Sequence, residues 1–158
     1  MEAPRLEFAM AVQLAMTEGR HDIGPLPSGG RRWALGVAGG RFEGPRLSGE
    51  VLPGGGEWPH LRPDGVLAIN ARYCLKERDG TIIYLENRGF RWAYEPKDFE
   101  RWLEGRGGGA SGFYMRVTPT FEVPEGPHDW LTRHVFVGVL GDGEAGVRGP
   151  FIRYYQLL

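Results

Sequence analysis

Glu57 is the residue in this sequence best placed to move a proton. It follows the glycine run 54–56 and precedes Trp58, so a loop of unusual backbone shape presents a carboxylate beside a flat aromatic ring. Aromatic and apolar surroundings disfavour a charged carboxylate, and the resulting rise in its pKa lets it exchange protons near neutral pH. The alternative is a solvated glutamate in a surface loop, and the residues alone do not separate the two.

Two later segments carry polar side chains at alternate positions. Asn70 and Arg72 share one side of an expected strand, and Arg116 begins a similar polar side that continues to Glu122. If these sides face an interior, Arg72 and Arg116 can stabilise the oxygen of an enolate or phenolate. Each would then need an anionic partner, because an unpaired buried guanidinium is very costly. If the same sides face water, they are ordinary surface, and both interpretations stay open.

Four more side chains can complete a small-molecule site. Asn87 interrupts the apolar alternation of Ile83 and Leu85, which is consistent with an amide that points inward. Trp58, Tyr84 and Trp130 can stack on or enclose a ring, although buried tryptophans are as often ordinary core residues. Together these residues favour a site for a small molecule, possible occupants being aromatic or anionic compounds.

Other common chemistries find little support. The four histidines lack a close metal-ligand spacing, and a metal site assembled from distant strands would begin with His60. Residues 107–112 match a dinucleotide fingerprint only formally, because they follow a helix and precede a strand, the reverse of what phosphate binding needs. None of the serines lies in a nucleophile elbow. We therefore expect no cofactor and no metal.

Composition indicates one all-β domain over residues 1–158. The 26 glycines and 12 prolines are scattered between apolar runs, as in a protein with many turns. The net charge of −1 gives no reason to expect a nucleic acid or a membrane as partner. Cys74 is the one cysteine, which excludes an internal disulfide. Neither a signal pattern nor a membrane-spanning run is evident, so we expect a cytoplasmic protein.

Turn signals divide the chain into eight expected strands and one helix. The strands are Leu6–Thr17, Arg31–Val37, Phe42–Val51, Val66–Lys76, Thr81–Phe90, Tyr114–Phe121, Leu131–Val139 and Phe151–Leu157. Glycine turns are expected at 39–40, 63–65 and 79–80. The helix, at 96–104, would plug or cover the β structure. This pattern predicts a single eight-stranded antiparallel barrel, lipocalin-like in shape, with a two-sheet sandwich as the alternative.

The order of several motifs resembles the small β-barrel family catalogued as domain of unknown function 3237. These motifs are GGRFEGPRL at 39–47, GEVLPGGGEW at 49–58, RPDG at 62–65, ARY at 71–73, NRG at 87–89 and the strand at 114–122. Three positions depart from the usual pattern of that family: Glu57 and Asn70 replace aspartates, and Thr132 replaces an asparagine. The change at Asn70 removes a charge, which puts any mechanism with two carboxylates there in doubt.

The resemblance implies that a set of polar residues converges inside the barrel. This set is Glu57, Asn70, Arg72, Asn87, Arg116 and Thr132. It also implies a role in small-molecule or aromatic polyketide metabolism, a branch of secondary metabolism, as a proton-transfer isomerase or cyclase. The leading hypothesis is thus a cofactor-independent acid–base enzyme in which Glu57 moves the proton and Arg72 stabilises the anion. A non-catalytic carrier barrel is the alternative, a barrel mouth that binds a partner protein is a third, and a homodimer stays open.

Overall fold

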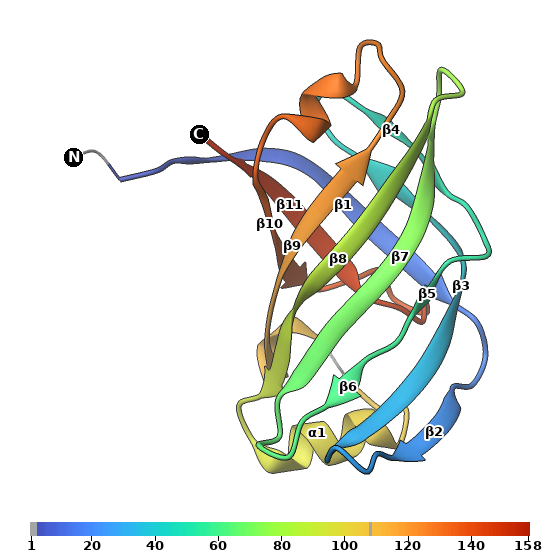
Figure 1. Cartoon of the computed structure of the whole chain (residues 1–158), viewed down its shortest axis with the longest axis vertical. Helices are drawn as coiled ribbons and strands as arrows, with labels where there is room; N and C mark the ends of the chain where they lie inside the picture. The colour runs from blue at the N-terminus through green and yellow to red at the C-terminus, as the bar shows by residue number, and fades with distance from the viewer. Residues whose placement is uncertain (1–2, 108) are drawn as a thin grey trace.

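The structure is a computed structural model that describes residues 3–107 and 109–158. Its strands form one antiparallel sheet that closes on itself (Figure 1). Seven of the strands are β1 (Leu6–Met16), β2 (His21–Pro25), β3 (Arg31–Glu43), β7 (Leu67–Glu77), β8 (Ile82–Ala93), β9 (Phe113–Glu122) and β10 (Phe136–Gly141). The other four are β4 (Ser48–Val51), β5 (Gly56–Glu57), β6 (His60–Leu61) and β11 (Phe151–Leu157).

Eight positions make up the barrel wall, because two of them are filled by interrupted strands. β1 and β2 lie end to end along β3, and β4, β5 and β6 lie end to end between β3 and β7. The remaining neighbours follow the order β7-β8-β9-β10-β11-β1, and the β1–β3 pairing closes the ring. The predicted eight-stranded antiparallel barrel is confirmed, in place of the sandwich. Closure removes the long unpaired edges that an open sheet of this size exposes.

The glycine pair at 39–40 lies inside a strand, so the expected turn there is wrong. β3 continues to Glu43, and the chain turns only at residues 44–47 before β4. A Cβ atom at Gly40 would lie 2.1 Å from the backbone oxygen of Gln13, which is too close for any side chain. The missing side chain therefore lets β1 pack against β3 where the barrel closes, and the expected single strand 42–51 is divided between β3 and β4.

The other two turn predictions are confirmed. Gly80 has φ 91° between β7 and β8, and the Gly80 amide donates to the Glu77 carbonyl. Gly65 has φ 84°, and its amide donates to the carbonyl of Arg62. Only glycine adopts such left-handed angles without a steric penalty, so both hairpins are fixed locally by sequence.

Helical segments lie at the two ends of the barrel (Figure 1). α1 (Pro96–Leu103) confirms the expected helix and packs Trp102 edge-on against Trp33, with 6.4 Å between ring centroids. At the other end the 3-10 helix η2 (Asp129–Thr132) occupies the start of the expected strand 131–139, which begins only at Phe136. A second 3-10 turn, η1, spans Ala110–Gly112. In the described part of the chain, no helix combines the length and apolarity needed to span a bilayer.

Alternation along the strands fills the interior with apolar side chains. On β7, Leu67, Ile69 and Leu75 point inward, and the residues between them point outward. β8 repeats the pattern with Ile83 and Leu85, both fully buried. Each such side chain contributes about 1.5–3 kcal/mol on burial, so this hydrocarbon lining is the main source of stability.

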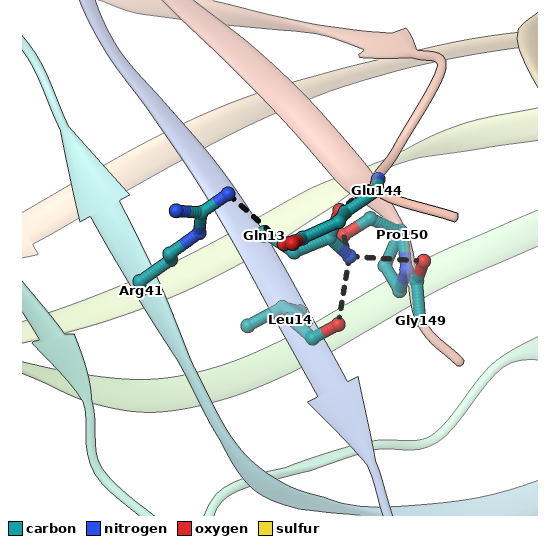
Figure 2. A network of polar contacts seen from close by, with 6 residues as sticks. All are labelled: Gln13, Leu14, Arg41, Glu144, Gly149 and Pro150. Atoms are coloured by element: carbon teal, nitrogen blue, oxygen red, sulfur yellow. Dashed lines mark hydrogen bonds and ion pairs between the residues drawn. The ribbon is translucent and has the colours of Figure 1, made fainter. Parts of the chain in front are cut away.

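A polar network on the outer wall fastens the segment that connects β10 to β11 (Figure 2). Gln13 is 4% exposed, and its amide nitrogen donates to the Leu14 carbonyl at 3.0 Å. The Gln13 side-chain oxygen accepts from the Glu144 amide at 3.0 Å, and Arg41 pairs with the Glu144 carboxylate at 2.9 Å. Because both the nitrogen and the oxygen of the Gln13 side chain form hydrogen bonds within the protein, the network has a structural role: it holds the β10–β11 connection against β1.

Candidate functional site

Glu57 enters the barrel because the glycine run permits a strand that contacts both neighbours closely. Gly54 has φ 102°. A Cβ at Gly55 would lie 2.5 Å from the Arg72 carbonyl oxygen, and one at Gly56 would lie 2.9 Å from the Leu35 carbonyl oxygen. Larger residues would push β5 away from β3 and β7. The glycines thus hold Glu57 at a fixed place in the wall.

Glu57 belongs to a row of residues that runs across four strands at the same height. It pairs with Leu35 on β3 and with Ala71 on β7, and Ala71 pairs in turn with Asn87 on β8. Ala71 and Asn87 are 6% and 1% exposed, which places them on the inner face. Neighbouring strands lie about 4.8 Å apart, so Glu57 and Asn87 are separated only by the methyl group of Ala71.

Burial controls the protonation of Glu57. The residue keeps some accessible surface, yet protein surrounds its carboxyl group, and desolvation raises its pKa from 4.5 to about 7. The positive charge of Arg91 acts in the opposite direction and limits the rise. Glu57 therefore changes protonation near neutral pH, the condition under which a carboxyl group can both take and return a proton.

Arg91 is the cation that acts on Glu57. It lies on β8, is 9% exposed, and its guanidinium carbon is 4.0 Å from the centroid of the Phe113 ring and 5.0 Å from that of Trp102. Burial lowers its pKa to about 10, and Glu57 offsets part of that change. Because a guanidinium remains protonated at neutral pH, Arg91 supplies a positive charge within the barrel, next to α1.

Two tyrosines and Asn87 form a buried polar network beside the acid. The Tyr73 and Tyr154 hydroxyls are 3.1 Å apart, and the Asn87 amide nitrogen donates to Tyr154 and, at 3.4 Å, to Tyr73. Burial raises the pKa of Tyr154 to about 12 and that of Tyr73 well above its usual value. Both phenols thus stay protonated and can only share hydrogen bonds. Among the described residues, the Asn87 side-chain oxygen has no donor.

The expected convergence of Asn70, Arg72 and Arg116 inside the barrel is wrong. Arg72 and Arg116 are exposed on the outer wall, and the half-buried Asn70 lies on the same outward side of β7. Arg72 pairs with Glu86 at 3.4 Å, and Arg116 lies 4.9 Å from the Tyr114 ring centroid. The reason is strand alternation: the apolar residues between them occupy the interior, which forces these polar positions outward.

The remaining predicted residues are also dispersed. Trp58 is 38% exposed, and Tyr84 lies on the outer face of β8, where its hydroxyl donates to Glu86 at 3.5 Å. Trp130 is buried in η2, 5.7 Å from the Phe136 ring, and Thr132 is exposed and donates to the Asp129 carbonyl. Of the predicted set, only Glu57 and Asn87 meet in the interior, and their functional roles stay predictions.

Three interior polar residues were not among the predicted site residues, although a signal for each existed. Ile83, Leu85 and Asn87 occupy every second position of β8. The same alternation continues through Gly89 to Arg91. Tyr73 shares the apolar side of β7, and Tyr154 shares that of β11. Extending each apolar alternation to its end would have placed these residues inside.

A possible metal-ligand group lies elsewhere, at the β7–β8 hairpin. Oxygens of Glu77 and Asp79 and a nitrogen of His128 lie within 4.8 Å of one another. His128 Nε2 is 2.8 Å from Asp79 Oδ2, a contact that also fastens the 123–128 segment to the hairpin. His60, the expected first member of a metal site, instead has its Nε2 3.2 Å from the Gly29 carbonyl oxygen. The outer wall also carries an open groove of about 680 Å³ along β1, β3 and β4.

Fold and interior together define a small closed β-barrel with an acid, a cation and two phenols inside it. The family described as "Protein of unknown function (DUF3237)" matches residues 4–157. The chain belongs to this family, as its motif order had suggested.

Individual relatives agree with this assignment. UPF0311 protein CA_C3321 of Clostridium acetobutylicum is 36% identical over 109 residues, 68% of each chain. The crystal structure of the conserved protein of unknown function RPA1785 from Rhodopseudomonas palustris matches with TM-score 0.86 and 25% identity over all of both chains. An enzyme from Penicillium herquei matches with TM-score 0.70 and 20% identity, covering all of this chain and 97% of that one. The last likeness concerns the fold alone.

Proposed function

We propose that this protein is a cofactor-independent acid–base enzyme that moves a proton within a small enolisable or aromatic compound held in the barrel. Glu57 is the proton-transfer group. The observation that carries the proposal is a buried carboxyl, held by β5 in a largely apolar interior, whose protonation is influenced by the charge of the buried Arg91 guanidinium. Arg91 replaces Arg72 and Arg116 in the role that sequence reasoning gave them.

Charge balance explains why this pair suits proton abstraction. Before reaction the carboxylate of Glu57 balances the guanidinium of Arg91. When Glu57 takes a proton from carbon or oxygen, the substrate becomes an anion and takes over as counter-ion of Arg91. The net charge of the buried site is the same before and after, so the step avoids the large cost of creating a lone charge in a low-dielectric interior.

Under this proposal, small and apolar side chains surround the place that the substrate would occupy. Ala71 leaves only a methyl group between Glu57 and Asn87, and the half-buried Leu35 forms the neighbouring wall. α1 lies across one end of the barrel (Figure 1), and the ring of its Trp102 lies with its centroid 5.0 Å from the Arg91 guanidinium carbon. The expected reactions are tautomerisation, or a ring closure that follows from it.

Hydrogen–deuterium exchange tests this proposal without knowledge of the natural substrate. A panel of small enolisable ketones is incubated with the protein in deuterated water near neutral pH, and loss of the α-proton signal is followed by NMR. We expect faster exchange for at least one ketone, and a loss of about 100-fold or more in Glu57→Gln, as for removal of a general base. Glu50→Gln, a surface change on β4, is the matched control.

Two results would contradict the proposal. Exchange that survives Glu57→Gln would remove Glu57 from the reaction. Tight ligand binding with no exchange for any compound would favour the carrier barrel instead.

A further inference from the structure

Four aromatic side chains gather on the outer wall of β8 and β9, toward the barrel end at which α1 lies (Figure 1). Phe90 and Trp92 are 50% and 38% exposed on β8, and Tyr94, which follows that strand, is 53% exposed. Trp92 stacks on Tyr114 of β9 with 5.3 Å between the ring centroids, and it meets Tyr94 edge-on at 5.1 Å. We call these four residues the aromatic face.

The exposed area of the aromatic face is large for a solvated surface. A buried aromatic side chain removes about 150–250 Å² from water, so these partly exposed rings present about 300–400 Å² together. A standard protein interface covers about 800 Å² on each partner, and somewhat more than half of that area is apolar. The aromatic face therefore offers most of the apolar surface that one side of a stable interface needs.

Charged side chains flank the aromatic face on two opposite sides. On the β9 side, Arg116 is the register partner of Phe90, and its guanidinium donates to the Met115 carbonyl at 2.8 Å. On the side of the β6–β7 turn, the Arg62 guanidinium carbon lies 5.8 Å from the centroid of the Phe90 ring, and Arg62 pairs with the half-exposed Asp64. In the described part of the chain, Arg116 forms no ion pair with a carboxylate.

We propose that the aromatic face is the surface through which two copies of this chain associate, about a two-fold axis that lies in the interface and runs along β8. Such a rotation places the β9 side of each copy opposite the β6–β7 side of the other. Arg116 then meets Asp64 of the partner subunit, and the same contact occurs twice. The combination of aromatic rings with arginine is also the one that protein interfaces favour.

Sedimentation velocity of the full chain over a range of concentrations measures this association. We expect the wild type to sediment as one chain when dilute and as a pair when concentrated. Trp92→Glu removes the central ring and adds a charge, so it should raise the dissociation constant of the pair about 30-fold or more, as at an interface hot spot. Ile82→Glu is the matched control, because Ile82 is 43% exposed at the opposite end of the same strand.

Two charge variants test the symmetry of the contact. Arg116→Glu and Asp64→Lys should each weaken the pair about tenfold or more, because each places like charges opposite one another at both symmetric positions. An equimolar mixture of the two variants should regain the wild-type affinity, since both contacts then join opposite charges. Arg78→Glu, at the exposed β7–β8 hairpin, is the control for the change of charge. Thermal unfolding confirms that each variant is folded.

Three results would overturn the inference. A wild type that sediments as one chain at every concentration would show that a second copy does not cover the aromatic face. A pair that Trp92→Glu leaves intact would place the contact elsewhere. A mixture of the two charge variants that associates no better than either alone would exclude the two-fold arrangement. The association does not depend on the chemistry proposed for the interior, so Glu57→Gln should sediment as the wild type does.

Discussion

Gly138 lies under the aromatic ring of Tyr154, and a Cβ atom added at Gly138 would come within 2.7 Å of Tyr154 Cε1. The two residues are register partners on β10 and β11. Because β10 has no side chain at this point, the ring can lie across it, and the Tyr154 hydroxyl accepts a hydrogen bond from Asn87 on β8. The missing side chain at Gly138 thus lets the Tyr154 hydroxyl reach Asn87, which lies two strands away from β10.

Gly138→Ala should therefore destabilise the protein by about 1–3 kcal/mol, as overpacking of a filled core does. The new methyl group would also lie 2.5 Å from Val117 Cγ2, so it would clash with side chains on both neighbouring strands. Urea unfolding measures the loss. Gly109→Ala is the control, because its Cβ would meet Asp142 Oδ1 at an ordinary 3.4 Å. Equal stability of the two variants would refute the close packing.

Glu57 should make stability decrease as pH rises. Its pKa is 4.5 in the unfolded chain and about 7 in the folded one, so between these values the folded protein binds more protons. The contribution is present in full below pH 4.5 and is lost as pH rises through 7, a change of about 3 kcal/mol. Unfolding free energies at a series of pH values, for the wild type and Glu57→Gln, should diverge by this amount. A difference in unfolding free energy between the two proteins that stays the same at every pH would contradict the raised pKa of Glu57.

Arg91 and Phe113 should stabilise each other through a cation–π contact. Their separation of 4.0 Å and their burial predict a coupling energy of about 1–2 kcal/mol. A double-mutant cycle with Arg91→Met and Phe113→Leu measures it from unfolding free energies. If the effects of the two changes on the free energy of unfolding are additive, the coupling energy is zero and the Phe113 ring and the Arg91 guanidinium do not stabilise each other.

Arg72 and Arg116 should be dispensable for the interior chemistry. Both lie on the outer wall, where solvent screens an ion pair such as that of Arg72 with Glu86. Arg72→Ala and Arg116→Ala should retain the deuterium exchange within about twofold of the wild type, the small change expected of surface residues. A loss of exchange as large as that of Glu57→Gln would restore the roles first expected of them.

The architecture was predictable because it depends on local signals. Turns with left-handed glycines, such as Gly65 and Gly80, fix hairpins from a few residues of sequence, and period-two alternation marks the strands between them. The prediction was wrong at Gly40, where a glycine serves the packing of β1 against β3 rather than a turn. That function depends on a strand almost 30 residues away, which local patterns do not report.

The candidate site was predictable only in part, for a related reason. Glu57 stood out because its glycine run is unusual, and Asn87 because it breaks an apolar face. Tyr154 enters the site from β11, which is distant in sequence, and only barrel closure brings it near the acid. Arg91 lies on β8, which is connected to the strand of the acid through β7. Polar residues on the outward side of β7 attracted attention by their number, whereas each inward polar residue is isolated among apolar neighbours.

The methyl group of Ala71 is the one inward side chain between the acid and the amide of Asn87. Under the proposed function, its size would set how much room a substrate has beside Glu57, independently of the groups that act on the substrate. Exchange of this residue for glycine or valine would be the natural way to widen or narrow the range of accepted compounds, and sequence variation at this position among relatives would record how that range has diverged.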